Sequence, residues 1–456
     1  MTVKKSFLQI AVFTLISGGV LVAQTKEAPP LLPPDPRYKA DILVVVAHPD
    51  DETEVSAYLA QQIDQYHRRV AIVYGTPGNS GGNSEGYEQA AALGAEREIE
   101  ARRADGYLGI TDIWFLRGTD TPGQNLLRSL ETWNHGEALD QMVRLVRLTR
   151  PEVILTWLPH YVAGENHGDH QAAGVIATEA FDLAGDPTWF PEQVAAPRNH
   201  LGVANLTEGL HPWQAEKIYY FTDASHEDFL NGQGPVYPAL GMDPVRHIPY
   251  YRVAAEQMEF HLTQDDTGQM AKQALATGDF TYFKEPTRLI FGKSLVPSAT
   301  TADVFAGVTA WPLVYAPHPG YRPASRNGLS VELGGPFAFY HRFWAAHGLD
   351  HLMNLLSPEV QIGARTLYIP VLIHNDTDAA AQVTLLPALP QGWTAQAGFE
   401  RYPVPAHAAY PAECVLDGPP GHQGSWQVVS IRAESSGSQI GELSMRVYLI
   451  GSGLPE

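Results

Sequence analysis

Short apolar runs alternate with amphipathic stretches through the first half of the chain. The runs Ile42–Val46, Val70–Tyr74 and Val153–Trp157 are typical of strands buried on both faces of a parallel sheet. Between them, apolar residues recur at helical spacing. This alternation predicts an α/β fold, a Rossmann-like and mostly parallel sheet with helices on both faces.

The same pattern locates further elements. Residues 112–116 and 218–221 are expected to form strands, and residues 87–108 and 171–181 are expected to form helices. A helix is also expected directly after the first strand, where apolar side chains recur at Val55, Leu59, Ile63 and Tyr66.

The pattern of apolar and polar residues changes near Thr300. Residues 426–433 and 443–450 alternate apolar with polar side chains, which predicts an all-β sandwich of antiparallel strands. We therefore expect an α/β domain over residues 39–299 and a β-sandwich accessory domain over residues 300–456. The accessory domain is expected to brace the first domain or dock on a surface, with glycan binding as the alternative.

A strongly polar stretch follows the first strand. It reads His48-Pro49-Asp50-Asp51-Glu52, and ligands of open α/β sheets bind at the carboxyl ends of the strands. An imidazole and a carboxylate can supply nitrogen and oxygen ligands to Zn²⁺. The alternative is that the acidic residues only cap the next helix. That alternative explains one carboxylate, but crowded carboxylates repel each other unless a cation or a proton is present.

A second polar cluster, His167-Gly168-Asp169-His170, follows the strand Val153–Trp157. A catalytic zinc usually has three protein ligands and one open position, and two ligands from the first cluster plus one histidine from the second give that number. The glycine-rich residues 75–82 lack the spacing of dinucleotide-binding and P-loop motifs. They are expected to form a wall of the pocket, with phosphate binding as the alternative.

Together these motifs resemble the PIG-L/LmbE-like family of zinc-dependent de-N-acetylases, over the first half to two thirds of the mature chain. Family members generally carry a Thr-His pair at the end of the strand that reads Thr156-Trp157 here. The supporting motifs are Ala47-His48-Pro49-Asp50-Asp51-Glu52, His167-Gly168-Asp169-His170, Gly75-Thr76-Pro77-Gly78, Arg97-Glu98-Ile99-Glu100 and Leu108-Gly109-Ile110.

The resemblance implies a role for each polar residue of the two main clusters. His48, Asp51 and His170 are expected to bind Zn²⁺. Asp50 is expected to be the general base that takes a proton from the attacking water. His167 is expected to be the acid or the electrostatic partner at the reacting amide.

Other residues carry two interpretations each. Asp169 is expected to orient His167 by accepting a hydrogen bond, or to be the N-cap of a helix. Arg97 and Asp120 fall where family members contact substrate, but Arg97 could equally form a structural ion pair with Asp120 or Glu100. The late segment His261-Leu262-Thr263-Gln264 resembles a His-x-Ser-Gln element of the family, with an expected structural role.

Composition and the N-terminus bear on partners and location. The 456 residues include 50 acidic and 30 basic side chains, for a net charge of −20, which argues against a nucleic-acid partner. Lys4 and Lys5, the apolar run 7–22 and Ala23 predict a signal peptide over residues 1–23. A proline-rich linker is expected over 24–38. We expect an exported protein, periplasmic or secreted, without a stable membrane span after cleavage; an uncleaved anchor is the alternative.

The expected function is zinc-dependent removal of N-acetyl groups from N-acetylglucosamine-type glycoconjugates outside the cytoplasm. The partner is then an N-acetylated amino sugar or glycoconjugate. Two alternatives stay open, a metal-dependent hydrolase of another amide or ester bond and a non-catalytic glycan-binding protein. Product analysis separates them, because deacetylation releases acetate and phosphoester hydrolysis releases phosphate.

Overall fold

A computed structural model supplies the coordinates. The predicted signal peptide, residues 1–23, lies outside the described residues, and so does most of the predicted linker, residues 24–38. No helix within the described residues has the length and apolar character needed to cross a membrane. The described residues are 34, 38–160, 167–194, 210–223, 227–264, 266–309, 328–362, 365–419 and 426–449.

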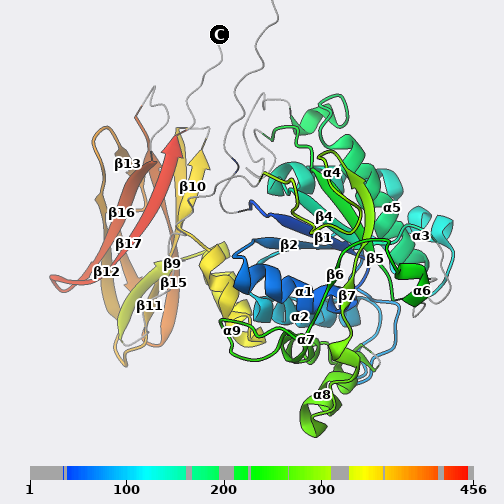
Figure 1. Ribbon diagram of the computed structural model, residues 1–456. Coiled ribbons are helices and arrows are strands. Elements are labelled where there is room, and N and C mark those ends of the chain that lie inside the picture. The colour runs from blue at the N-terminus through cyan, green and yellow to red at the C-terminus, as the bar shows by residue number, and fades with distance from the viewer. Residues whose placement is uncertain are drawn as a thin grey trace, which may run out of the picture. The chain divides into compact units, whose positions relative to one another are not determined.

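A six-stranded sheet forms the centre of the first domain (Figure 1). The first five strands of its order β3-β2-β1-β4-β5-β8 are parallel, and β8 pairs antiparallel with β5 at the edge. This confirms the predicted mostly parallel sheet. The strands are β1 (Ile42–Val46), β2 (Val70–Tyr74), β3 (Asp112–Phe115), β4 (Val153–Trp157), β5 (Lys217–Phe221) and β8 (Ile290–Ser294).

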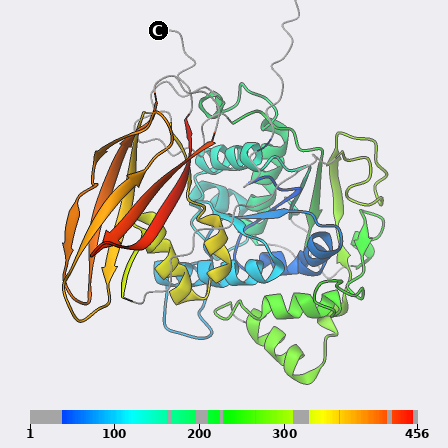
Figure 2. The same cartoon turned by 90° about the vertical axis from the view of Figure 1, so that its left-hand side faces the viewer.

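Helices cover both faces of this sheet. Figures 1 and 2 show α4 and α5 on one face and α1 and α2 on the other. All residues of β1 are buried, which explains why its sequence has no polar position. The helices of the first domain are α1 (Ser56–Ala60), α2 (Ala91–Leu108), α3 (Leu126–Thr132), α4 (His135–Thr149), α5 (Gly168–Leu183), α6 (Glu227–Leu230), α7 (Tyr250–Met258) and α8 (Thr267–Thr277).

The strand order reverses between β1 and β4, which are hydrogen-bonded neighbours. In open α/β sheets a crevice forms at this point, outside the carboxyl ends of the strands. One polar cluster follows β1 directly, and the other stands at the start of α5, the helix that comes after β4. The topology therefore brings two segments that lie more than a hundred residues apart in the sequence to one edge of the sheet.

The helix expected after β1 is broken into three parts. A 3₁₀ turn covers Asp51–Val55, α1 covers Ser56–Ala60, and a π-helical turn covers Gln61–Gln65. The expected helical stretch is present, but it is not a regular α-helix throughout. The cause is local, because Asp50 has a left-handed backbone (φ 102°) and its carbonyl oxygen accepts hydrogen bonds from Thr53.

Close packing of α5 on β4 depends on a glycine. A Cβ atom at Gly174 would lie 2.3 Å from the carbonyl oxygen of Trp157 and 3.0 Å from backbone atoms of Pro159. A side chain at this position would push α5 away from β4. Since His170 lies one turn earlier on α5, the glycine also fixes how near that histidine comes to the end of β4.

The strands from β9 onward form two sheets of a sandwich, and among the described residues from 365 to 449 there is no helix. Its apolar core is a separate cluster from that of the first domain, which ends at Val304. The domain boundary at residue 300 stays a prediction. One sheet contains β10 (Glu359–Ile362), β17 (Ser438–Leu449), β16 (Trp426–Ser435), β12 (Ala381–Ala388) and β14 (Arg401–Val404). The other contains β13 (Thr394–Ala397), β15 (Ala408–Asp417), β11 (Thr366–Asn375) and β9 (Leu329–Leu333).

Smaller elements complete the chain. Helix α9 and the 3₁₀ turn after it lie between β9 and β10 in sequence, a helical insertion that the sequence pattern did not predict. They are α9 (Pro336–His347), η6 (Asp350–Leu355), η3 (Pro191–Gln193), η5 (Tyr282–Lys284) and the two-residue strands β6 (Val236–Tyr237) and β7 (Thr287–Arg288).

Candidate metal and catalytic site

The carboxylate of Asp51 is held in one orientation. Its Oδ2 accepts hydrogen bonds from the backbone N–H groups of Ala47 (2.8 Å) and His48 (3.0 Å) and from Nε1 of Trp157 (2.6 Å). Its other oxygen, Oδ1, lies 3.2 Å from Nε2 of His170 and 3.6 Å from Nδ1 of His48. One oxygen is thus fully used by donors, and the other faces two histidines.

A third imidazole lies beside the two that face this oxygen. Nitrogen atoms of His48, His167 and His170 all lie within 4.8 Å of one another. The ring of His170 stacks on Trp157 with a centroid separation of 4.1 Å and an interplanar angle of 2°. The structure therefore brings the predicted ligands His48, Asp51 and His170 together, with His167 beside them.

His48 is fixed from its opposite side by two carboxylates. Its Nε2 lies 3.2 Å from Oδ1 of Asp120 and 3.4 Å from Oδ2 of Asp169. These partners favour a proton on Nε2, so in the neutral ring Nδ1, on the side of Asp51, is the nitrogen left for a metal ion. A carboxylate behind a histidine is the usual support of a metal-binding imidazole.

The electrostatics of the cluster favour positive charge. Burial lowers the pKa of His48, but hydrogen bonds with Asp120, Asp169 and Asp51 outweigh burial and raise it well above the usual value. Burial raises the pKa of Asp51, but His170 and His48 outweigh it, and the result lies well below the usual range. A site that stabilises a protonated imidazole against carboxylates is also one that attracts a metal cation.

Asp50 differs from Asp51 in every contact. Its Oδ2 accepts a hydrogen bond from Oγ1 of Thr267 (3.0 Å), and its backbone is left-handed. Burial, and then the charge of Asp51, raise the pKa of Asp50 to about 7. A carboxylate with such a pKa can take up and release a proton near neutral pH, as a general base must.

His167 caps α5, and this determines its tautomer. Its Nδ1 accepts a hydrogen bond from the backbone N–H of Asp169 at 3.2 Å, so the neutral ring carries its proton on Nε2. Burial, and then the charges of His48 and His170, lower its pKa. The neutral form is therefore favoured, which suits a hydrogen-bond donor better than a group that gives up a full proton.

The contacts of Asp169 correct one expectation. Its carboxylate accepts hydrogen bonds from the backbone N–H (2.9 Å) and the hydroxyl (2.6 Å) of Thr121 and also faces His48. It thus supports His48, whereas the sequence predicted that it would orient His167. The N-cap of α5 is His167, so the capping alternative for Asp169 is also wrong.

Arg97 holds loops together. Its guanidinium donates to the carbonyl oxygens of Gly78, Gly82 (2.7 Å) and Thr263 (3.0 Å), and the residue is only 3% exposed. This differs from the ion pair with Glu100 or Asp120 considered from sequence. The arginine lines the pocket, and its N–H groups donate to carbonyl oxygens of the loops that form the pocket wall. Its role as a substrate contact stays a prediction.

A cavity of about 380 Å³ opens in front of these residues. Its near wall is the predicted site, including Asp120, which also accepts a hydrogen bond from the backbone N–H of Ser80 (2.7 Å). Other lining residues, most of them from later segments, were not assigned to the site from sequence. The unassigned lining residues include Glu54, Asp223, Met258, Met270 and Tyr282.

Trp157 is the residue of the site that sequence reasoning missed. It stands where family members generally have a histidine, and the structure gives it a hydrogen bond to Asp51 and a stack on His170. The signal was present in the strand β4, because a fully buried tryptophan needs an acceptor for its indole N–H. The nearest buried acceptors in the expected site were the two aspartates.

Trp157→Phe is therefore expected to weaken metal binding about 10–100-fold, since phenylalanine keeps the stack on His170 but leaves Asp51 without its side-chain donor. The affinity is measured by titration against a competing chelator. Trp213→Phe is the matched control, because its indole N–H donates to the carbonyl oxygen of Pro151 (2.7 Å), away from the site. Equal metal affinity in the two variants would contradict the support of Asp51 by Trp157.

Comparisons with known proteins find similar sequences and structures. Residues 43–181 match the family described as PIG-L, GlcNAc-PI de-N-acetylase. A 1D-myo-inositol 2-acetamido-2-deoxy-alpha-D-glucopyranoside deacetylase of Geodermatophilus obscurus is 27% identical over 305 residues, 59% of this chain and 97% of that protein. A deacetylase of the same name from Frankia casuarinae is 30% identical over 194 residues, 39% of this chain and 57% of its own length. The N,N'-diacetylchitobiose deacetylase of Pyrococcus horikoshii is 16% identical over 56% of this chain and 85% of its own, with a TM-score of 0.39.

The site at the switch point lies within residues that match a family of de-N-acetylases, which are hydrolases of carbon–nitrogen amide bonds. More particularly, the chain carries a PIG-L domain of the LmbE-like type, followed by a β-sandwich region. The resemblance inferred from the two motifs is confirmed. The motifs themselves, residues 47–52 and 167–170, both lie within the matched residues.

Proposed function

We propose that this protein is a zinc-dependent de-N-acetylase that acts on N-acetylglucosamine-type glycoconjugates outside the cytoplasm. Deacetylation is supported by the PIG-L domain and by relatives whose names are deacetylases of an acetamido sugar. Export is supported by the charged and apolar N-terminal sequence. Zinc is supported by the mixed nitrogen and oxygen donors of the site.

One observation carries the proposal. Asp51 places one oxygen in a frame of three donors and directs the other at His48 and His170. A carboxylate that served only as a helix cap would not need this division of its two oxygens. Two imidazoles and one carboxylate are a common ligand set of catalytic zinc. The residues present therefore fit the ion.

His48, Asp51 and His170 would hold the zinc. When bound, zinc acidifies water and polarises the amide carbonyl of the substrate. Asp50 lies beside the ligands, has no ligand role in this arrangement, and has a pKa of about 7. It takes the proton of the water that adds to the carbonyl carbon.

The bond that breaks is the one between the carbonyl carbon and the sugar nitrogen. The departing amine needs a proton, and the proton held by Asp50 supplies it, so acetate and a free amino sugar are the products. In its neutral form His167 carries a proton on Nε2. It donates this N–H to the carbonyl oxygen of the substrate, where negative charge develops. No proton need leave His167 in this scheme.

The test is an assay of the purified mature protein on a panel of N-acetylglucosamine conjugates, with the alternatives in the same experiment. We expect release of acetate and an amine, loss of activity with a chelator, and recovery with Zn²⁺. Release of phosphate from phosphoesters, or of an acid from simple esters but no amide, would favour another hydrolase. Binding of glycan without any product would favour a non-catalytic protein. Fractionation of the producing cells tests export.

A further inference from the structure

The peptide unit between Pro49 and Asp50 is gripped at both of its polar ends by side chains. Its carbonyl oxygen, on Pro49, accepts a hydrogen bond from Nε2 of Gln264. Its N–H, on Asp50, donates to Oε2 of Glu52 at 3.0 Å. The plane of this peptide sets the direction from which the side chain of Asp50 departs.

The backbone of Asp50 needs such support. Its φ of 102° lies in the region that residues with a Cβ rarely adopt, and such a conformation costs on the order of 1–3 kcal/mol unless surrounding contacts enforce it. Strain of this kind is often held at functional sites. The carbonyl oxygen of Asp50 is itself held by Thr53, so the residue is fixed on both sides.

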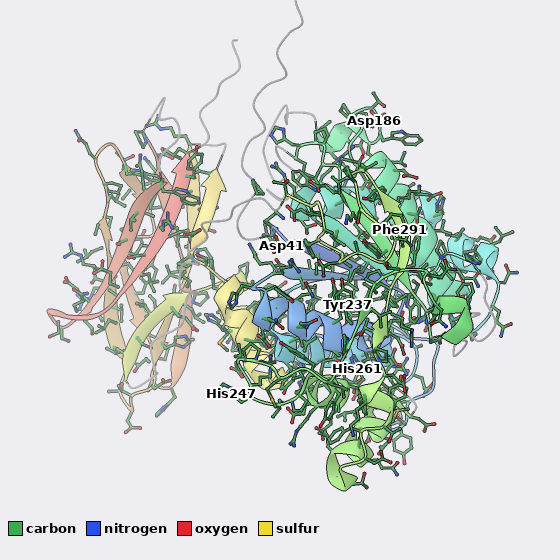
Figure 3. The ribbon with its side chains drawn as sticks, viewed as in Figure 1. Asp41, Asp186, Tyr237, His247, His261 and Phe291 are labelled. Carbon is green, nitrogen blue, oxygen red and sulfur yellow. The ribbon has the colours of Figure 1, made fainter. Side chains whose placement is uncertain are left out.

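Glu52 is in turn fixed from behind. Its Oε1 accepts hydrogen bonds from Nε2 of Gln257 (2.6 Å) and from Nε2 of His261 (2.6 Å). All three residues are completely buried, and none of them lines the cavity. Figure 3 labels His261 beside the helices α1 and α7. A charged group is costly to bury, and here one oxygen of the buried carboxylate accepts the backbone N–H of Asp50.

We propose that Glu52, held by Gln257 and His261, acts with Gln264 as a clamp on the Pro49–Asp50 peptide, so that the carboxylate of Asp50 is aimed at the attacking water. These are positioning residues, since each is argued to act on the base through the Pro49–Asp50 peptide. The inference rests on the proposed function, in which Asp50 is the base. It gives α7 and the residues after it, some 200 positions later in the chain, a part in catalysis.

The competing explanation is that this network only stabilises the core. Both explanations expect a loss of stability when a hydrogen bond is removed, so stability alone cannot separate them. They differ in turnover, because a misdirected base lowers kcat while substrate and metal binding persist. A displacement of about 1 Å at a reacting group can cost on the order of 100-fold in rate.

The experiment compares Gln257→Met with Gln193→Met. Both glutamines are buried and away from the cavity, and Nε2 of Gln193 donates to the carbonyl oxygen of Asp140 (2.8 Å). We expect both variants to lose stability, but only Gln257→Met to lose kcat, by about 10-fold or more. KM and zinc content should stay within about twofold of the wild type. Equal kcat in the two variants would overturn the clamp.

A second variant, Glu52→Gln, removes the charge and turns an amide N–H₂ toward one of its former donors. Its kcat is expected to fall about 10–100-fold with zinc retained. In an Asp50→Asn background the same change should cost nothing further, because positioning of an absent base has no effect. A full additional loss in that background would show that Glu52 acts elsewhere. If Glu52→Gln does not fold, Gln257→Met and its double variant with Asp50→Asn decide the question.

Failure of the proposed function is distinguishable from failure of the clamp. If the wild-type protein releases no acetate from any conjugate, the function is wrong, and the clamp is then tested by crystal structures of Gln257→Met and Glu52→Gln. If the clamp holds the peptide, the backbone of Asp50 should leave its left-handed conformation near φ 102° in these variants. An unchanged backbone at Asp50 would overturn it whatever the substrate.

Discussion

Asp51→Asn is expected to lose the metal and the activity together. The asparagine oxygen can take over the three hydrogen bonds that Oδ2 accepts from Ala47, His48 and Trp157. Its N–H₂ group must then occupy the position of Oδ1, facing the two histidines. An amide nitrogen has no lone pair to give to a metal, so the variant should fold yet hold little zinc.

Zinc content by elemental analysis and turnover are measured on the same preparation, and we expect both to fall at least about tenfold, as loss of one of three ligands implies. Asp112→Asn is the control, since Asp112 forms its ion pair with Arg69 (3.7 Å) at the start of β3. That variant should keep zinc and turnover. Full zinc in Asp51→Asn would remove Asp51 from the ligand set.

The sheet could be predicted from sequence because its strands are buried on both faces. β1 and β4 have no exposed residue, and their predicted bounds agree with those in the structure. Parallel order then places the ends of these strands side by side, so the convergence of His48 and His170 follows from topology. The bounds predicted from the amphipathic stretches were less accurate, since the helix expected from residue 87 begins at Ala91.

The rest of the site depends on contacts that no local pattern encodes. For Arg97 an ion pair with a carboxylate was one expectation, but its guanidinium donates to carbonyl groups of two loops that are distant in sequence. Asp169 was assigned to the histidine nearest in sequence, yet Thr121 and His48 hold it. A side chain surrounded by polar neighbours can satisfy its hydrogen bonds in several ways, and only the packed fold selects one.

The irregular helix after β1 could not be predicted for a related reason. Apolar spacing reports which face is buried, but it does not report the backbone conformation of Asp50, on which the start of the helix depends. The left-handed residue, the 3₁₀ turn and the buried Glu52 form one unit, because the hydrogen bonds of Asp50 run to Glu52 and Thr53. The departure from a regular helix therefore occurs where the expected chemistry lies, which is common at functional sites.

Asp50→Asn is expected to fail in the opposite way from Asp51→Asn. The asparagine oxygen can still accept the hydrogen bond of Thr267, and the three ligands are untouched, so zinc content should equal that of the wild type. The amide cannot take a proton from water, and kcat should fall about 10²–10⁴-fold. Because the base acts in the transition state, kcat and kcat/KM should fall together with little change in KM.

Zinc content by elemental analysis and turnover are measured for both variants, and each variant serves as the control for the other. If both were only helix-capping carboxylates, both variants would show modest losses of stability and near-normal turnover. A variant Asp50→Asn with full zinc and full activity would end the general-base assignment. Full zinc with a lost kcat, beside the zinc-poor Asp51→Asn, would place the proton transfer on Asp50 and the metal on its neighbour.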